Sequence, residues 1–242
     1  MIELREITKK YGDFRAVDNL NLTVARGEIF GFLGPNGAGK TTTIKMVAGV
    51  LEPSAGTITV GGIDILKQPE AAKRKIGFIP DRPYLYEKLT GMEFLKFTAD
   101  LYGVPNEIYH ENARKNLAMF SLTDWSDELI ESYSHGMKQR LIMSAALLHE
   151  PEIIIVDEPM VGLDPAAIIM VKELFQSLAR HGVSVFMSTH TLAVAEEVCD
   201  RVGIIHRGRL VASGTTADLR REANVTDADL EMIFLNLTNI AN

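Results

Sequence analysis

Residues 34–41, GPNGAGKT, restrict the possible folds of this chain more than any other stretch. They match the pattern G-x-x-x-x-G-K-[S/T], and the hydrophobic periodicity around them predicts a strand before the loop and a helix after it. The glycines Gly34, Gly37 and Gly39 allow backbone conformations in which successive N–H groups converge on phosphate oxygens at a helix N-terminus. The stretch therefore predicts a phosphate-binding loop between a strand and a helix.

The side chains of this loop supply charge and metal ligands. We expect the Lys40 ammonium to neutralise the outer phosphates and the Thr41 hydroxyl to ligate Mg²⁺. Thr42 is expected to add an oxygen contact to an inner phosphate. The other loop residues expected to contact the phosphates are Pro35, Asn36 and Ala38. The loop thus predicts a phosphate site that uses Mg²⁺.

Strands and helices alternate on both sides of a long helical segment. Residues 90–150 have a helical pattern, with Thr90 and Ser134 as N-caps. Strands are predicted at the N-terminus, before the phosphate loop, and over residues 56–60, 76–80, 152–156 and 183–188; helices over 165–180, 192–200 and 226–242; and a hairpin over 206–209. This alternation predicts an α/β fold with a mostly parallel sheet, helices on its faces and an all-helical insertion.

Composition restricts the class of protein further. The chain has 242 residues, of which 46% are apolar, which suits one domain or two subdomains with a shared core. The formal charge of −7 argues against a broad basic surface for nucleic acid. We expect no signal peptide, no membrane span and one free thiol, Cys199, which predicts a cytosolic protein that reaches a membrane only through a partner.

Two adjacent carboxylates follow an apolar run far downstream of the phosphate loop. In IIIVDEP, residues 153–159, the run predicts a strand buried on both faces that ends at Asp157 and Glu158. Ligands of open parallel sheets bind at the carboxyl ends of the strands. We therefore expect Asp157 to hold Mg²⁺ and Glu158 to accept a proton from an attacking water.

His190 follows a second apolar strand, in MSTH. It is expected at the same edge of the sheet, where it can reach a terminal phosphate and position a water. A helix cap or a buried structural histidine is the alternative, and the neighbouring phosphate loop and carboxylates favour the catalytic interpretation.

These motifs, in this order, resemble the ATP-binding subunits of ABC transporters over residues 1–214. The segment YSHGMKQR, residues 133–140 and called the signature segment below, occupies the position of the family's LSGGQ motif. Ser134 lies 94 residues after Lys40 and 23 residues before Asp157, which fits the family spacing. The resemblance implies a P-loop NTPase core with an N-terminal antiparallel β subdomain. It further implies one domain, with the core at 1–85 and 150–214, the helical subdomain at 86–149 and a helical tail at 215–242.

The resemblance also implies how the chain works. Two copies would pack head to tail, so that Ser134 and Gly136 of one copy approach the γ-phosphate bound by the other. Tyr11 resembles the aromatic residue that stacks on adenine, and the Leu163–Asp164 pair resembles the loop that crosses the dimer interface. The implied function is Mg-ATP hydrolysis that drives a separate membrane permease from the cytoplasmic face of the membrane.

This chain departs from the family pattern at two places. The family commonly has a glutamine where this chain has Asp81, and a carboxylate still ligates Mg²⁺ but donates no hydrogen bond when ionised. The second departure is His135, where glycine is usual, followed by Met137 two residues later. The signature segment and PYLYEKLTGMEFL, residues 83–95, are similar to those of exporters of drugs, antibiotics and polysaccharides.

Two alternatives remain. The first is an ABC ATPase without a transport role, in repair, translation or cluster assembly, although the coiled coil, zinc module or tandem cassette of such proteins is absent from the sequence. The second is a P-loop kinase or GTPase, which would leave the signature segment unexplained and would need an N-K-x-D motif that the sequence lacks.

Overall fold

The computed structural model describes residues 1–82, 84–223 and 230–240, and side chains up to residue 237. Within these residues, six strands form the main sheet in the order β10-β9-β3-β8-β7-β6. Their bounds are β3 (Ile29–Leu33), β6 (Ile76–Ile79), β7 (Ile153–Asp157), β8 (Ser184–Thr189), β9 (Arg201–His206) and β10 (Arg209–Gly214). All neighbours are parallel except β9 and β10, which form the predicted hairpin. The predicted mostly parallel sheet is confirmed.

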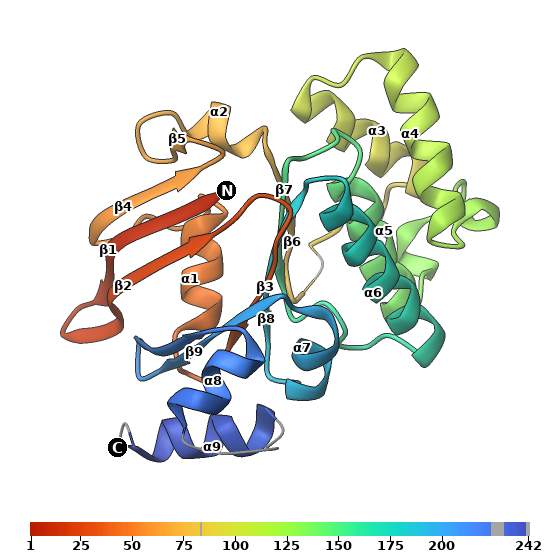
Figure 1. Ribbon diagram of the computed structural model, residues 1–242. Helices are drawn as coiled ribbons and strands as arrows, with labels where there is room; N and C mark the ends of the chain where they lie inside the picture. The colour runs from red at the N-terminus through yellow and green to blue at the C-terminus, as the bar shows by residue number, and fades with distance from the viewer. Residues whose placement is uncertain (83, 224–229, 241–242) are drawn as a thin grey trace.

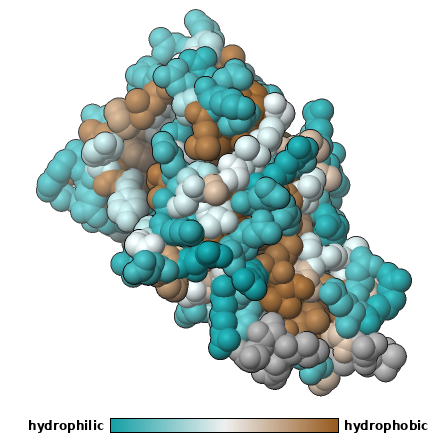
Figure 2. Space-filling model, turned by 90° about the vertical axis from the view of Figure 1, so that its left-hand side faces the viewer, coloured by the Kyte–Doolittle hydropathy of each residue, from teal (hydrophilic) through white to brown (hydrophobic). Residues whose placement is uncertain are grey.

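A second, antiparallel sheet lies beside the main one, with strand order β2-β1-β4-β5 among the described residues. It comprises β1 (Ile2–Tyr11), β2 (Phe14–Val24), β4 (Ala55–Val60) and β5 (Ile63–Asp64). In β1, Ile2, Leu4 and Ile7 are buried and point toward the core, whereas most of the residues between them are polar. The side of the molecule that carries this sheet is accordingly largely hydrophilic, with its apolar areas separated by polar side chains (Figure 2). The antiparallel subdomain is confirmed.

Helix α1 (Lys40–Val47) lies between the two sheets (Figure 1). Its Ile44 belongs to one hydrophobic cluster with Ile2 of β1 and Phe186 of β8. Because Ile44 and both of these partners are fully buried, the start of α1 is held by packing on two sides. Since α1 begins at Lys40, this packing also fixes the phosphate loop.

The helical insertion lies between β6 and β7 and occupies the other side of the main sheet (Figure 1). It contains α3 (Gly91–Tyr102), α4 (Asn106–Met119), α5 (His135–Ala146) and two short 3₁₀ helices, η1 (Thr123–Trp125) and η2 (Ile130–Ser132). The predicted N-caps are confirmed: Thr90 caps α3 in a capping box with Glu93, and Ser134 caps α5. Phe94 of α3 and Val156 of β7 share one hydrophobic cluster, so the insertion and the sheet have a common core. The subdomain boundaries at 86 and 149 stay a prediction.

The remaining helices complete the layers. They are α2 (Pro69–Lys73), α6 (Pro165–Arg180), α7 (Leu192–Val198), α8 (Thr216–Glu222) and α9 (Leu230–Ile240). The predicted helix over 226–242 is described from Leu230 onward, and its first residues lie outside the described part. Within the described part of the chain, no helix combines the length and the hydropathy needed to cross a bilayer.

One predicted boundary is wrong for a tertiary reason. The helix predicted over 192–200 ends at Val198, because Cys199 adopts an extended conformation. Asp200 then pairs with the start of β3: its carboxylate accepts from the Ile29 N–H at 2.8 Å, and its own N–H donates to the Ile29 carbonyl at 2.9 Å. These long-range bonds end the helix and bring β9 to the edge of β3.

His149 is held neutral inside the helical insertion. Its ring stacks on Tyr102 with 3.8 Å between ring centroids, and its Nε2 lies 3.0 Å from the Ile76 carbonyl. Since a carbonyl only accepts, Nε2 carries the hydrogen, and Nδ1 is buried without a partner in the described structure. Burial lowers the pKa of His149 to about 4.

This pKa predicts acid destabilisation. The unfolded chain takes up a proton near pH 6.5, whereas folded His149 does so only near pH 4, so stability is lost as pH falls from above 6.5 toward 4. Between pH 7 and pH 5 the free energy of unfolding should fall by about 1–2 kcal/mol on account of this group. His149→Gln keeps a hydrogen-bond donor for the Ile76 carbonyl but has no imidazole to protonate. Urea unfolding of this variant should therefore show no fall in the free energy of unfolding from this group between pH 7 and pH 5. The matched control is His110→Gln, at an exposed histidine, which should leave the pH dependence of the wild type in place.

Candidate functional site

The phosphate loop leaves the middle of the main sheet and packs closely against two other backbones. A Cβ at Gly39 would lie 2.6 Å from the Ala16 carbonyl of β2, and a Cβ at Gly34 would collide with the Ile205 carbonyl and lie 2.8 Å from its Cγ2. Gly39 also has a φ of 109°, which non-glycine residues rarely adopt. Glycine is therefore required at Gly34 by space and at Gly39 by space as well as by conformation.

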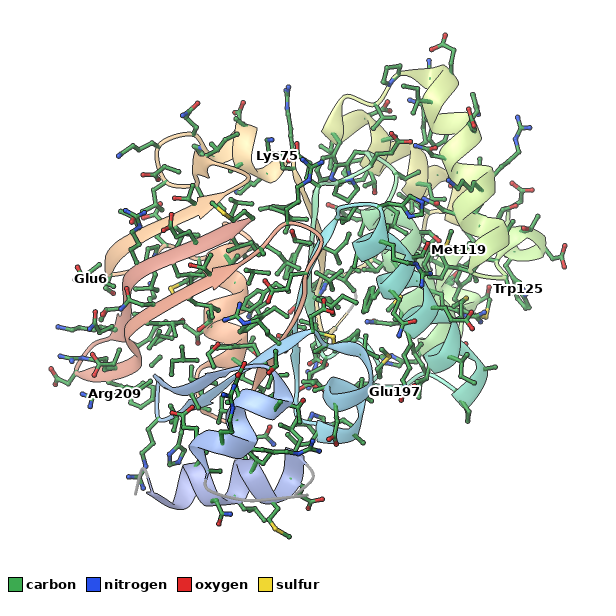
Figure 3. The ribbon with its side chains drawn as sticks, in the orientation of Figure 1. Glu6, Lys75, Met119, Trp125, Glu197 and Arg209 are labelled. Carbon is green, nitrogen blue, oxygen red and sulfur yellow. The ribbon has the colours of Figure 1, made fainter. Side chains whose placement is uncertain are left out.

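The hairpin between β9 and β10 is hydrogen-bonded to this loop. The Gly208 N–H donates to the Ala38 carbonyl at 2.9 Å, and the Asp18 N–H of β2 donates to the Gly208 carbonyl at 2.8 Å. Arg209, labelled in Figure 3 beside the β1–β2 hairpin, pairs with the Asp18 carboxylate at 2.7 Å. The hairpin thus links the phosphate loop to the antiparallel sheet.

Lys40 is buried at the start of α1. Its ammonium donates to the Gly34 carbonyl at 2.7 Å and to the Pro35 carbonyl at 3.2 Å. Burial lowers the pKa of Lys40, and the negative charges of Glu158 and Asp157 act in the opposite direction. The cation is thus held inside the loop by two backbone carbonyls.

The two predicted carboxylates lie where β7 ends, next to the end of β8. Asp157 is buried and accepts a hydrogen bond from the Ser188 hydroxyl. Glu158 has a φ of 53°, an uncommon conformation for this residue type, and its N–H donates to the Ser188 carbonyl at 3.1 Å. His190 Nδ1 lies 2.9 Å from Glu158 Oε1, so the predicted base and histidine are in direct contact.

A cleft of about 520 Å³ brings these parts together. Its wall includes most of the residues predicted for the site: Tyr11, Asn36, Gly37, Gly39, Lys40, Thr41, Thr42, Asp81, Glu158 and His190. Tyr11 and Phe14 pair with each other beside the β1–β2 turn and are 50% and 64% exposed at one end of the cleft, where the Lys9 ammonium lies over the Tyr11 ring, 5.3 Å from its centroid. The geometry provides an aromatic end and a phosphate end.

Six predicted residues are not part of the cleft wall. Three of them are in the phosphate loop: Gly34, Pro35 and Ala38. A fourth, Asp157, is the last residue of β7. The other two, Ser134 and Gly136, lie at the start of α5. Ser134 is committed to its cap, since its hydroxyl accepts from the Met137 N–H at 3.2 Å. Within one chain, the signature segment does not line the cleft.

Sequence reasoning missed four residues. Phe14, Ala16 and Val161 line the cleft, and Ser188 binds Asp157. Phe14 was detectable, because it follows Tyr11 across a two-residue turn with glycine at its first position. The other three depend on which strands and loops become neighbours.

Two anchors fix the signature segment. The Tyr133 hydroxyl donates to the Trp125 carbonyl at 2.5 Å, and the two rings meet edge to face; Trp125 is labelled on the insertion in Figure 3. On its other side, the ring of His135 lies directly against Gly162: a Cβ at Gly162 would be 2.7 Å from His135 Nε2. His135, the departure from the family glycine, therefore packs the signature segment against the interface loop, residues 161–165. Asp164, in this loop, is the N-cap of α6.

The available metal ligands fit Mg²⁺. Thr41 and Asp157 supply hard oxygen donors, and Asp81 lies in the cleft wall. No group of three or more His, Cys, Asp or Glu residues suited to hold a metal occurs in the described part of the chain. A partial oxygen set is typical of Mg²⁺ that shares its coordination with substrate phosphates.

The fold and the cleft define a P-loop nucleotide-binding domain. A family model described as "ABC transporter" matches residues 17–161, which is more than half of the chain. The chain belongs to the ABC transporter family. The predicted family is confirmed, and the kinase or GTPase alternative has no support.

Curated relatives agree with this assignment. The chain is 38% identical to the probable multidrug ABC transporter ATP-binding protein YbhF of Escherichia coli over 98% of its own length, but spans only 41% of YbhF. It is 41% identical to the linearmycin resistance ATP-binding protein LnrL of Bacillus subtilis, over 90% of this chain and 70% of LnrL.

Solved structures share the fold. An ATP-binding subunit of an ABC transporter is 36% identical, with a TM-score of 0.94, over 98% of this chain and 99% of the other. The dimeric cassette MJ0796 in a post-hydrolysis state with ADP and Pi is 25% identical, with a TM-score of 0.77, over 89% of this chain and 98% of the other.

The contact between His135 and Gly162 predicts a steric coupling. Gly162→Ala should destabilise the chain by about 1–3 kcal/mol, because the new methyl group meets the imidazole and because φ is 77°. Gly62→Ala is the matched control, since Gly62 has a φ of 81° and an added Cβ there would meet no atom within 4 Å. Chemical unfolding should show a larger loss for Gly162→Ala than for Gly62→Ala. In a His135→Gly background the two losses should become equal, and an excess that persists there would contradict the coupling.

Proposed function

We propose that this chain is the ATP-hydrolysing subunit of an ABC exporter, and that it binds Mg-ATP in the cleft described above. The observation that carries the proposal is the convergence of Lys40, Glu158 and His190 on one cleft whose other end is aromatic. Tyr11 and Phe14 offer ring faces to the adenine base, and the loop N–H groups and Lys40 bind the phosphates. ATP has a base for the aromatic end of the cleft and phosphates for the loop end, whereas a smaller phosphate compound would occupy only the loop end.

Hydrolysis follows from the positions of these groups. Glu158 accepts a proton from the water that attacks the γ-phosphate, and His190 holds its carboxylate at 2.9 Å. Lys40 stabilises negative charge on the transferring phosphoryl group. Thr41 and Asp157 would hold Mg²⁺, which supplies further charge neutralisation on the phosphates. Asp81 is proposed as an additional metal ligand in place of the family glutamine.

A second copy of the chain completes the site. Ser134 and Gly136 belong to a signature segment that stands apart from the cleft of its own chain. The N-terminus of α5 carries N–H groups without partners inside the helix and a partial positive charge, which suits a phosphate supplied by another chain. We propose a head-to-tail homodimer in which each signature segment meets the nucleotide of the partner.

The remaining partner is a membrane permease. The names of YbhF and LnrL refer to multidrug transport and to linearmycin resistance, which supports an exporter over a role in repair, translation or cluster assembly. We propose that the chain works at the cytoplasmic face of the membrane, attached through the permease, and that it binds no nucleic acid.

Removal of the base tests the chemistry. Glu158→Gln should lower the ATPase rate at least about a hundredfold, because the amide no longer accepts a proton, while ATP affinity changes little. Steady-state phosphate release and calorimetric ATP titration measure the two effects separately. Glu152→Gln, at an exposed glutamate just before the same strand, is the matched control and should retain the wild-type rate. A Glu158→Gln rate near that of the wild type would exclude Glu158 as the base.

A mixture of two inactive chains tests the shared site. Lys40→Ala removes the phosphate-binding cation, and Ser134→Arg places a bulky side chain at the start of α5, so both homodimers should be inactive. In a cross-linked heterodimer the two lesions fall in one site, and the other site keeps an intact Lys40 facing an intact Ser134. Single-turnover hydrolysis should return at this site.

Two control measurements are needed for this experiment. Thermal unfolding of each variant alone shows whether loss of the Ser134 cap, worth about 1 kcal/mol, has unfolded α5. A cross-linked wild-type dimer must hydrolyse ATP. If folded heterodimers are as inactive as their parents, the signature segment does not act on the partner's nucleotide.

A further inference from the structure

Ser188 contacts both acidic residues of the site, although sequence reasoning assigned it no role there. Strands β7 and β8 are parallel neighbours, and their register places Ser188 directly opposite Asp157. The Ser188 hydroxyl donates to Asp157 Oδ1, and the Ser188 carbonyl accepts from the Glu158 N–H at 3.1 Å. One residue therefore holds the side chain of the first acid and the backbone of the second.

The Ser188 hydroxyl matters because both it and the Asp157 carboxylate are buried. Asp157 and Ser188 are 3% and 0% exposed, and a carboxylate that is shielded from water needs hydrogen-bond donors from the protein. The bond at Oδ1 also restricts rotation of the carboxylate plane, which presents the second oxygen, Oδ2, in a defined orientation. A cation with strict geometry, such as Mg²⁺, benefits from an oxygen that is already oriented.

Packing alone does not require a hydroxyl at this position. Ser188 lies at the end of an otherwise apolar buried run, Val185, Phe186 and Met187. An alanine at 188 would be similar in size and would leave no polar group of its own to satisfy. The serine is thus explained by its bond to Asp157.

We propose that Ser188 is a positioning residue that orients Asp157 toward Mg²⁺, so that the metal strengthens nucleotide binding more when this bond is intact. The proposal rests on the proposed function, because it takes Mg-ATP as the ligand. It assigns to Ser188 no contact with the nucleotide. Binding of ATP without the metal, through the phosphate loop, should not depend on Ser188.

The test compares ATP affinity with Mg²⁺ and with EDTA, by calorimetry on the full chain. In Ser188→Ala, the gain in affinity that Mg²⁺ gives to the wild type should shrink about tenfold, while the affinity measured in EDTA stays within about twofold. Ser188→Thr keeps the hydroxyl and should restore the gain. Ser184→Ala is the matched control, because Ser184 is an equally buried serine at the other end of β8 whose hydroxyl donates to the Ala25 carbonyl at 2.8 Å. It should keep the wild-type gain.

The outcomes separate this proposal from the proposed function. A wild type that binds no ATP contradicts the proposed function itself. A wild type with a normal Mg²⁺ gain that Ser188→Ala retains overturns the role of Ser188, as does an equal loss in Ser184→Ala. If Ser188→Ala does not fold, Ser188→Cys replaces it: the thiol is similar in size but a weak donor, so the gain should again shrink, and a full gain would overturn the proposal.

Discussion

The close approach of three backbones at the phosphate loop is the constraint on which the rest of the structure depends. Gly34 lies against Ile205 of β9, and Gly39 lies against Ala16 of β2, with no room for a side chain at either glycine. In the folded chain, this loop is therefore packed against β9, which pairs with β3, and against β2 of the antiparallel sheet. Ala16, near the start of the chain, and Ile205, near its end, thus meet at this loop. The phosphate site is a product of the whole fold, although its sequence is local.

The chemistry is concentrated at the ends of two neighbouring strands. Strand β7 brings Asp157 and Glu158, and β8 brings Ser188 and His190 to the same edge. Each acid is thereby paired with a group from the adjacent strand, which fixes the proposed metal ligand and the proposed proton acceptor without any contribution from a nucleotide. A catalytic constellation on strand ends is more rigid than one on long loops. Lys40 faces this edge from the start of α1.

How much of this could be predicted depended on the range of the interactions involved. The strand and helix on either side of residues 34–41, the caps at Thr90 and Ser134 and the alternation of strands and helices follow from local signals, and the structure confirms them. Phe14 and Ser188 escaped prediction because each acts through a neighbour that only strand pairing supplies. The end of α7 was misplaced for the same reason, since Asp200 leaves the helix to pair with Ile29. The contact of His135 with Gly162 likewise depends on how α5 meets the interface loop.

The hydrogen bonds of Lys40 have a consequence for ligand selection. Its ammonium is bound to the carbonyls of Gly34 and Pro35, which lie in the loop that we propose binds the phosphates. These carbonyls are internal competitors of any anion that enters. A nucleotide gains from Lys40 only the difference between the two sets of partners, and only multiply charged phosphate oxygens exceed neutral carbonyls by a wide margin. A nucleoside without phosphates would leave the lysine where it is, so the loop discriminates by charge and not by the shape of the base.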